Sequence, residues 1–217
     1  MSAGSKSASR EDVYEWWSRH PGALDVLYTV AFLGREREFR EESLERLDLD
    51  TGERVLEIGC GTGNSLRALR QSVGPDGTVV GLDPSRGMTR VAHDRIRRSQ
   101  WENASVLQAD ARHPPIRGQS MDAAYAAMSL SAVANLTKAV QSIKRVLRPS
   151  GRFVVLDARP FQDFPWTLLN PVVTPVAKRT TNWVTEIDFV AALRREFERV
   201  KVTSYNGGSI VIVRAEG

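Results

Sequence analysis

A short glycine-rich stretch carries the residues with the clearest chemical potential. Residues 55–63 read VLEIGCGTG, so three glycines alternate with other residues directly after an apolar run. Glycine lacks a Cβ and tolerates positive φ, which lets the backbone turn tightly and approach a ligand closely. An acid, Glu57, stands two residues before the first glycine. This pattern predicts a strand that ends in a ligand-binding loop.

Two further acids follow the next apolar runs along the chain. Asp83 comes directly after Val79–Leu82, and Asp110 comes shortly after Ala104–Gln108. An acid about 20 residues after such a glycine loop can accept hydrogen bonds from both hydroxyls of a ribose. A carboxylate after the third strand can accept one from an adenine amino group. Ligands of open α/β sheets bind along the carboxyl edge, so the three acids indicate a site for an adenosine-containing cofactor.

The glycine loop alone leaves two cofactor classes open, because nicotinamide-dependent dehydrogenases also place glycines after their first strand. Two details separate the classes. The glycines are spaced G-x-G-x-G, and Asn64 stands where the third glycine of G-x-G-x-x-G would be. Glu57 also falls where a nicotinamide-binding fold normally continues an apolar strand. The sequence therefore favours a different adenosine cofactor, with a nicotinamide oxidoreductase as the rival class.

The elements that must position these residues follow an alternating pattern. From Asp50 onward, short apolar runs alternate with amphipathic helical periods, which is typical of βαβ units around a parallel sheet. We expect strands at Arg54–Ile58, Thr78–Leu82, Ala104–Gln108, Met121–Ala127, Arg152–Leu156, Arg199–Tyr205 and Ser209–Val213. We expect helices at Gly34–Leu47, Asn64–Ser72, Arg86–Arg98, Lys138–Leu147 and Glu186–Phe197. The predicted fold class is α/β.

Together these motifs resemble those of class I S-adenosylmethionine-dependent methyltransferases. Glu57–Gly63 is similar to the first motif of that family, and Gly81–Asp83 and Ala109–Ala111 are similar to its ribose-side and adenine-side acids. Val146–Arg152 resembles the entry into its fifth strand, although Ser150 replaces the usual glycine. The resemblance implies a doubly wound, mostly parallel seven-stranded sheet with helices on both faces and a C-terminal antiparallel hairpin.

The resemblance also implies which residues hold S-adenosylmethionine. Glu57 would lie near the methionine moiety, the backbone of the glycine loop would follow the methionine and ribose, and Met88 would contact the adenine. The full set of expected cofactor residues is Glu57, Gly59, Gly61, Gly63, Asn64, Asp83, Pro84, Met88, Asp110, Ala111, Ala127 and Met128. The sulfonium makes the methyl group reactive by itself, so the protein needs chiefly to position an acceptor. The sequence indicates no catalytic residue.

Composition excludes several other classes. One cysteine permits no intramolecular disulfide, and three scattered histidines lack ligand spacing, so we predict no bound metal. The formal charge is only +4, and acids interleave with bases, as in Arg35–Glu38. Such interleaving favours a solvated helix face over a nucleic-acid-binding patch. No apolar run approaches the roughly 20 residues that cross a bilayer, and no signal peptide is visible. We expect a disordered tail at 1–10 and a cytoplasmic location.

The acceptor is less constrained than the cofactor. Cys60 lies inside the glycine loop, which does not suit the cysteine nucleophile of cytosine C5-methyltransferases, and Ala126–Ser129 lacks the Asn/Asp-Pro-Pro-aromatic motif of adenine N6 enzymes. Arg145–Asp157 resembles a signature of quinone C-methyltransferases, with several departures. Val13–Trp17 and Tyr205–Gly208 resemble phosphatidylethanolamine N-methyltransferase-like proteins. We expect in-line methyl transfer to a small-molecule or lipid-like acceptor, with a non-catalytic cofactor-binding protein as the alternative.

The regions outside the motifs suggest where that acceptor binds. We expect an N-terminal helical lid at 11–47 and a methyltransferase domain at 48–217, with an insertion at 158–185 over the acceptor site. The candidate acceptor residues are Tyr14, Trp17, His20, Trp183 and Tyr205. The insertion combines apolar and aromatic residues with Lys178 and Arg179, and four prolines predict a short helix or a loop flap. This mixture predicts a lipid or isoprenoid acceptor and reversible membrane contact, or else a small apolar pocket.

Overall fold

A seven-stranded sheet forms the centre of the protein. The computed structural model describes residues 34–133, 135–181 and 188–217, together with Trp17, Arg19, His20, Gly22, Thr29 and Phe32. The strand order is β3-β2-β1-β4-β5-β7-β6. β1 to β5 are parallel, whereas β7 is antiparallel to β5 and to β6. The predicted doubly wound sheet with an antiparallel C-terminal hairpin is confirmed.

Most strands begin and end where the sequence pattern predicts. They are β1 Arg54–Ile58, β2 Thr78–Asp83, β3 Ala104–Gln108, β4 Met121–Ala127, β5 Leu147–Ala158, β6 Arg199–Tyr205 and β7 Ile210–Glu216. β5 is longer at both ends than the predicted Arg152–Leu156. Leu147 pairs with Met121 of β4, and β7 pairs with β5 as far as Ala158. The predicted end of β7 was also too early, because its pairing with β5 continues to Glu216.

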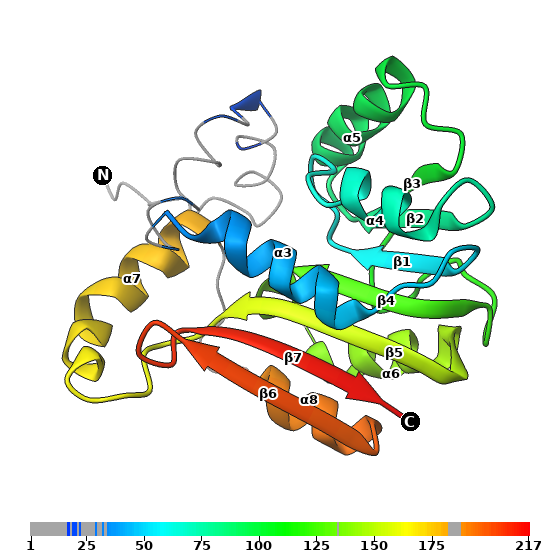
Figure 1. Ribbon diagram of the computed structural model, residues 1–217. Coiled ribbons are helices and arrows are strands. Elements are labelled where there is room, and N and C mark those ends of the chain that lie inside the picture. Colours follow the sequence, from blue (N-terminus) through cyan, green and yellow to red (C-terminus); the bar gives the residue numbers. More distant parts are fainter. Residues whose placement is uncertain are drawn as a thin grey trace, which may run out of the picture.

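Helices cover both faces of the sheet (Figure 1). They are α3 Glu36–Leu47, α4 Leu66–Val73, α5 Arg86–Arg98, α6 Leu136–Val146, α7 Asn170–Thr181 and α8 Phe189–Glu196, with 3-10 turns η1 Leu130–Ala132 and η2 Trp166–Leu169. α3, α4 and α5 share one core with the sheet, and α6 and α8 share the other. α6 begins two residues earlier than predicted, because the Asn135 side chain accepts a hydrogen bond from the Lys138 N–H.

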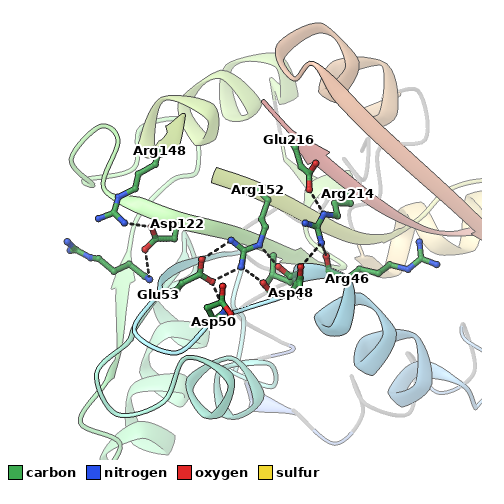
Figure 2. Close-up of polar contacts among 11 residues, drawn as sticks. Arg46, Asp48, Asp50, Glu53, Asp122, Arg148, Arg152, Arg214 and Glu216 are labelled. Carbon is green, nitrogen blue, oxygen red and sulfur yellow. Dashed lines mark hydrogen bonds and ion pairs between the residues drawn. The ribbon is translucent and has the colours of Figure 1, made fainter. Parts of the chain in front are cut away.

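The C-terminal end of α3 is fastened to the amino edge of the sheet by two arginines (Figure 2). Arg152 of β5 donates to the carbonyl oxygen of Leu47 and forms a 2.5 Å ion pair with Glu53. Arg214 of β7 donates to the carbonyl oxygen of Arg46 at 2.5 Å. The guanidinium groups thereby satisfy carbonyls that a helix leaves unpaired at its end. α3 is therefore held in one register against the sheet.

The segment after β5 forms an arm beyond the carboxyl edge of the sheet (Figure 1). It contains η2 and the 12-residue α7, which agrees with the short helix that the prolines predict. Pro171 stands in the first turn of α7, where a helix tolerates proline, and Pro175 lies inside the helix. Among the described residues, no helix combines the length and apolar character needed to span a membrane.

Candidate functional site

A cavity of about 660 Å³ lies at the carboxyl ends of the first four strands. Its walls come from the loops after these strands, from the start of α5 and from α3. The predicted cofactor residues that line it are Glu57, Gly59, Gly61, Asn64, Asp83, Pro84, Met88, Asp110, Ala111, Ala127 and Met128. Gly63 alone of the predicted set is outside this lining. The sheet thus brings together side chains that the sequence spreads over more than 70 positions.

The glycine loop has one position without room for a side chain and one that faces the cavity. Gly59 has a φ of +63°, and a Cβ there would lie 2.4 Å from the Cβ of Ser129. Gly61 has a φ of +53°, and no atom of the described residues lies within 4 Å of the place its Cβ would take. At Gly63 a Cβ would meet Leu66 of α4 at 2.9 Å. Gly63 therefore packs at the turn into α4, away from the lining that the resemblance implies for it.

Asp83 holds the loop and lines the cavity at the same time. Its Oδ2 accepts the backbone N–H of Gly61 at 3.0 Å, and its Oδ1 accepts that of Ser85 at 2.8 Å. Burial raises the pKa of the Asp83 carboxyl to about 6, although both hydrogen bonds favour its charged form. A carboxylate has about four lone-pair positions, so two bonds leave capacity for a ligand. Asp83 can therefore receive hydroxyl donors without releasing the loop.

Glu57 lies deeper, at 2% exposure. Its Oε2 is buried and has no hydrogen-bond partner among the described residues. Burial raises the pKa of the Glu57 carboxyl to about 7, opposed by the charge of Arg40 and by a hydrogen bond with Ser65. A buried oxygen without a partner carries an uncompensated desolvation cost. A donor group of a ligand in the cavity would remove that cost.

Asp110 and Met88 supply the features expected beside an adenine ring. Arg112 forms an ion pair with Asp110 at 2.5 Å, and its hydrogen bonds hold the pKa of the Asp110 carboxyl below its ordinary value. Asp110 is thus ionised and partly occupied by Arg112. Met88 is buried and gives the cavity an apolar surface on α5. A ring with an amino group fits this pairing of an acceptor with an apolar wall.

Arg40 of α3 lines the cavity, and the sequence analysis missed it. It belongs to a run of alternating charges that is typical of a solvated face, yet its side chain is only 15% exposed. Its Nη2 pairs with Glu36 at 2.6 Å, and its Nη1 donates to the Ser65 hydroxyl at 2.6 Å. The feature of the sequence that could have identified Arg40 is its position directly after Phe39, which is buried, at the border of the apolar face of the helix.

The loop after β4 is held in place from two sides. Ser129 donates its hydroxyl to the carbonyl oxygen of Ile58 at 2.7 Å. Asp157 of β5, which is fully buried, accepts both the backbone N–H and the hydroxyl of Ser131, at 2.9 and 2.7 Å. Burial raises the pKa of the Asp157 carboxyl. These contacts fix the backbone around Met128, which has a φ of +53° and lines the cavity.

The predicted acceptor residues are not brought together in the described part of the chain. Tyr14 and Trp183 lie outside the described residues. Trp17 is buried and His20 is exposed, and neither belongs to the cavity lining. Much of the predicted lid at 11–47 is also outside the described residues, and its last helix, α3, packs on the sheet. The acceptor roles of these residues stay predictions.

Tyr205 lies against α3 and outside the cavity lining. Its hydroxyl donates to Glu42 and accepts from Arg46 at 3.1 Å, and its ring lies 4.9 Å from that of Phe39. Burial, followed by the hydrogen bond with Glu42, raises the pKa of the Tyr205 hydroxyl to about 12. Tyr205 therefore connects the end of β6 to α3, and this position gives its predicted contact with the acceptor no support.

Comparisons with known proteins agree with this geometry. Residues 55–151 match a family model described as a methyltransferase domain. Over 148 residues the chain is 31% identical to a demethylmenaquinone methyltransferase from Lactobacillus johnsonii, covering 68% of this chain and 61% of that protein. It is 34% identical to methyltransferase GfsG from Streptomyces halstedii over 66% of this chain and 49% of that one. The matched region thus spans less than two thirds of either relative.

A solved structure shares the fold at lower sequence identity. The geranyl diphosphate C-methyltransferase from Streptomyces coelicolor A3(2), solved with S-adenosyl-L-homocysteine, has a TM-score of 0.65 and 16% identity over 82% of this chain and 74% of that one. The chain carries a class I S-adenosylmethionine-dependent methyltransferase domain. Its cofactor is S-adenosylmethionine. Two features fit that cofactor: within the part of the chain that the structure describes, the Oε2 of Glu57 has no hydrogen-bond partner, and the backbone at Gly61 has no side chain against it.

Acidification should weaken cofactor binding to the methyltransferase domain. The ionised forms of Glu57 and Asp83 accept hydrogen bonds best, and their pKa values are about 7 and 6. Because protons must leave before the ligand binds, the affinity for S-adenosylhomocysteine should fall at least about tenfold from pH 8 to pH 5.5. Calorimetric titration across this range measures the effect. Glu57→Gln should remove the step near pH 7, and a flat profile in the wild type would contradict both assignments.

The stability of the ligand-free protein should show the opposite sign. Both acids have a higher pKa in the folded chain than the ordinary values of 4.5 and 3.8. Between those values the folded state binds more protons than the unfolded state, so these two groups add stability as the pH falls from about 7 towards 4. Thermal melts of the ligand-free protein measure this contribution, and the increase in melting temperature caused by S-adenosylhomocysteine should shrink over the same range because the affinity falls.

Proposed function

We propose that the protein transfers the methyl group of S-adenosylmethionine to a small-molecule, lipid-like acceptor by in-line displacement. The observation that most directly supports this function is the cavity at the carboxyl edge of the sheet, which is lined by Glu57, Asp83 and Asp110. When bound, the cofactor supplies an electrophilic methyl group, so the chain contributes binding, orientation and exclusion of water. Asp83 would accept the ribose hydroxyls, and Glu57 would accept the ammonium of the methionine moiety.

The end of the cavity near β4 suits an apolar acceptor. Its lining there includes Ala127, which ends β4, and Met128, Ala132 and Val133, which follow that strand. An apolar ring would displace water from such a wall and gain the free energy of burial. The relative from Lactobacillus johnsonii is named for demethylmenaquinone, a molecule with an isoprenoid chain. Both observations support an isoprenoid acceptor.

Transfer of labelled methyl groups tests the proposed activity. Purified protein would be given S-adenosylmethionine with a tritiated methyl group, with demethylmenaquinone as the apolar acceptor and a catechol as the water-soluble one. We expect label in the quinone fraction and none in the catechol. The control variant Leu107→Ser changes an exposed side chain of β3 and should retain activity. Binding of S-adenosylhomocysteine without transfer to either probe or to a lipid extract would favour a non-catalytic cofactor-binding protein.

The arm after β5 has the surface expected of a membrane-contacting segment. Its exposed large hydrophobic residues, with exposed fractions from 41% to 81%, are Phe164, Trp166, Leu168, Leu169, Val172, Val173 and Val176. Elsewhere in the described chain, Leu107 is the only large hydrophobic residue whose side chain is also exposed, at 37%. No acid occurs between Phe164 and Thr181, whereas Lys178 and Arg179 do. A segment that combines exposed apolar side chains with basic residues suits an anionic bilayer surface.

Binding to vesicles tests this membrane contact. We expect the protein to sediment with phosphatidylglycerol-containing vesicles at low salt and much less with neutral phosphatidylcholine, because electrostatic attraction adds to apolar burial. Replacing Leu168 and Val172 together with serine should abolish sedimentation. Leu107→Ser removes an exposed apolar side chain from β3 and should leave it unchanged. Equal sedimentation of the double variant, or none of the wild type with either vesicle, would overturn the membrane contact.

A further inference from the structure

Two side chains of opposite charge in the cavity wall share one hydrogen-bond partner. Glu57 and Arg40 both line the cavity, and Ser65 forms hydrogen bonds with both side chains. The positive charge of Arg40 opposes the burial effect on the pKa of the Glu57 carboxyl, which places the two groups within electrostatic reach. A wall that presents a carboxylate beside a guanidinium matches a ligand end that carries an ammonium beside a carboxylate.

Arg40 keeps hydrogen-bonding capacity after its protein contacts are counted. Its Nε and Nη2 both donate to the same oxygen of Glu36, at 3.2 and 2.6 Å, and its Nη1 donates to Ser65. A guanidinium has five N–H donors, so these bonds with described residues leave two. Those two belong to the terminal nitrogens, the part of arginine that binds carboxylates. The side chain can thus take an anionic group without losing its present partners.

α3 holds Arg40 in a fixed place before any ligand binds. The buried hydroxyls of Ser43 and Tyr125 form a 2.7 Å hydrogen bond that joins the helix to β4. Arg152 and Arg214 hold the far end of the helix at the amino edge of the sheet (Figure 2). A side chain that is already ordered loses less conformational entropy on binding. Arg40 is therefore already ordered at the cavity wall before a ligand binds.

We propose that Arg40 binds the carboxylate of the methionine moiety of S-adenosylmethionine, while Glu57 binds its ammonium. This makes α3, which precedes the sequence motifs of the domain, the source of recognition for the amino-acid end of the cofactor. The proposal depends on the cofactor of the domain and not on which acceptor is methylated. It predicts that the loss of Arg40 matters only for ligands that carry the amino-acid group.

Two probes separate this role from a structural one. S-adenosylhomocysteine carries the amino-acid group, and 5′-methylthioadenosine shares the nucleoside and sulfur but lacks that group. In calorimetric titrations, Arg40→Met should weaken S-adenosylhomocysteine about 10- to 100-fold, the range of a hydrogen-bonded charge pair, and should leave 5′-methylthioadenosine within twofold. Arg40→Lys should restore part of the loss, because it keeps the charge but not the fork. Arg37→Met is the matched control, since Arg37 is exposed on the same helix.

Each outcome of these titrations decides the proposal. Unchanged affinity for S-adenosylhomocysteine in Arg40→Met would overturn it. Equal weakening of both probes would also overturn it, because it would show that Arg40 supports the fold of the loop. Failure of methyl transfer in a wild-type protein that still discriminates between the probes would count against the proposed activity and leave the role of Arg40 intact.

Discussion

Asp83→Ala is expected to weaken the binding of S-adenosylhomocysteine by about 1.5–3 kcal/mol, the range for hydrogen bonds to a charged group. The carboxylate accepts N–H groups from Gly61 and Ser85, and it presents its remaining lone pairs to the cavity. Its removal therefore costs the ribose contacts and loosens the loop that carries them. Calorimetry measures the affinity, and the melting temperature of the ligand-free variant measures how much of the loss comes from the loop.

Asp110→Ala is the matched comparison for this prediction. Asp110 also lines the cavity, but it is more exposed and is already paired with Arg112 at 2.5 Å. At most one adenine contact is lost with it, so its effect on affinity should be clearly smaller than that of Asp83→Ala. If Asp83→Ala left the affinity unchanged, or if Asp110→Ala had the larger effect, the assignment of the two ends of the cofactor would be wrong.

The local features of this chain could be predicted because their signal lies within a few neighbouring residues. Glu57, the glycine loop and Asp83 each sit at the end of an apolar run, and the parallel sheet then places those ends on one edge. Strand bounds failed only where distant pairing decides them. β5 extends beyond the predicted Arg152–Leu156 because it pairs with β4 at one end and β7 at the other.

The missed residues share a different property, which is that their partners are far away in sequence. Arg40 bonds Ser65, 25 positions later, and Asp157 bonds Ser131, 26 positions earlier. In the sequence, Arg40 is one charge in a run typical of a solvated helix face, and Asp157 is a departure from a family signature. Tyr205 shows the converse: its aromatic and polar character suits an acceptor site, whereas in the structure its ring and hydroxyl contact α3. Residue type alone cannot distinguish these cases.

Asp157→Ala is expected to cost about 3–5 kcal/mol of the free energy of unfolding, a large part of what a domain has. The fully buried carboxylate accepts the N–H and hydroxyl of Ser131 and the N–H of Ala158. Its loss leaves buried donors without partners, and each costs about 1–3 kcal/mol. Urea unfolding at pH 7 measures the change. Ser131→Ala, which removes one donor and leaves the acceptor, should cost distinctly less.

This loss should also reach the cofactor site, because η1 ends at Ala132 and is followed by Val133, and both residues line the cavity. Since burial raises the pKa of Asp157, the carboxyl disfavours the folded state more at higher pH, and the wild-type advantage over Asp157→Ala should be greater at pH 5.5 than at pH 8. Saturating S-adenosylhomocysteine should recover part of the variant's stability, as binding to the native state requires. A variant as stable as the wild type at both pH values would show that this carboxylate does not hold the loop after β4.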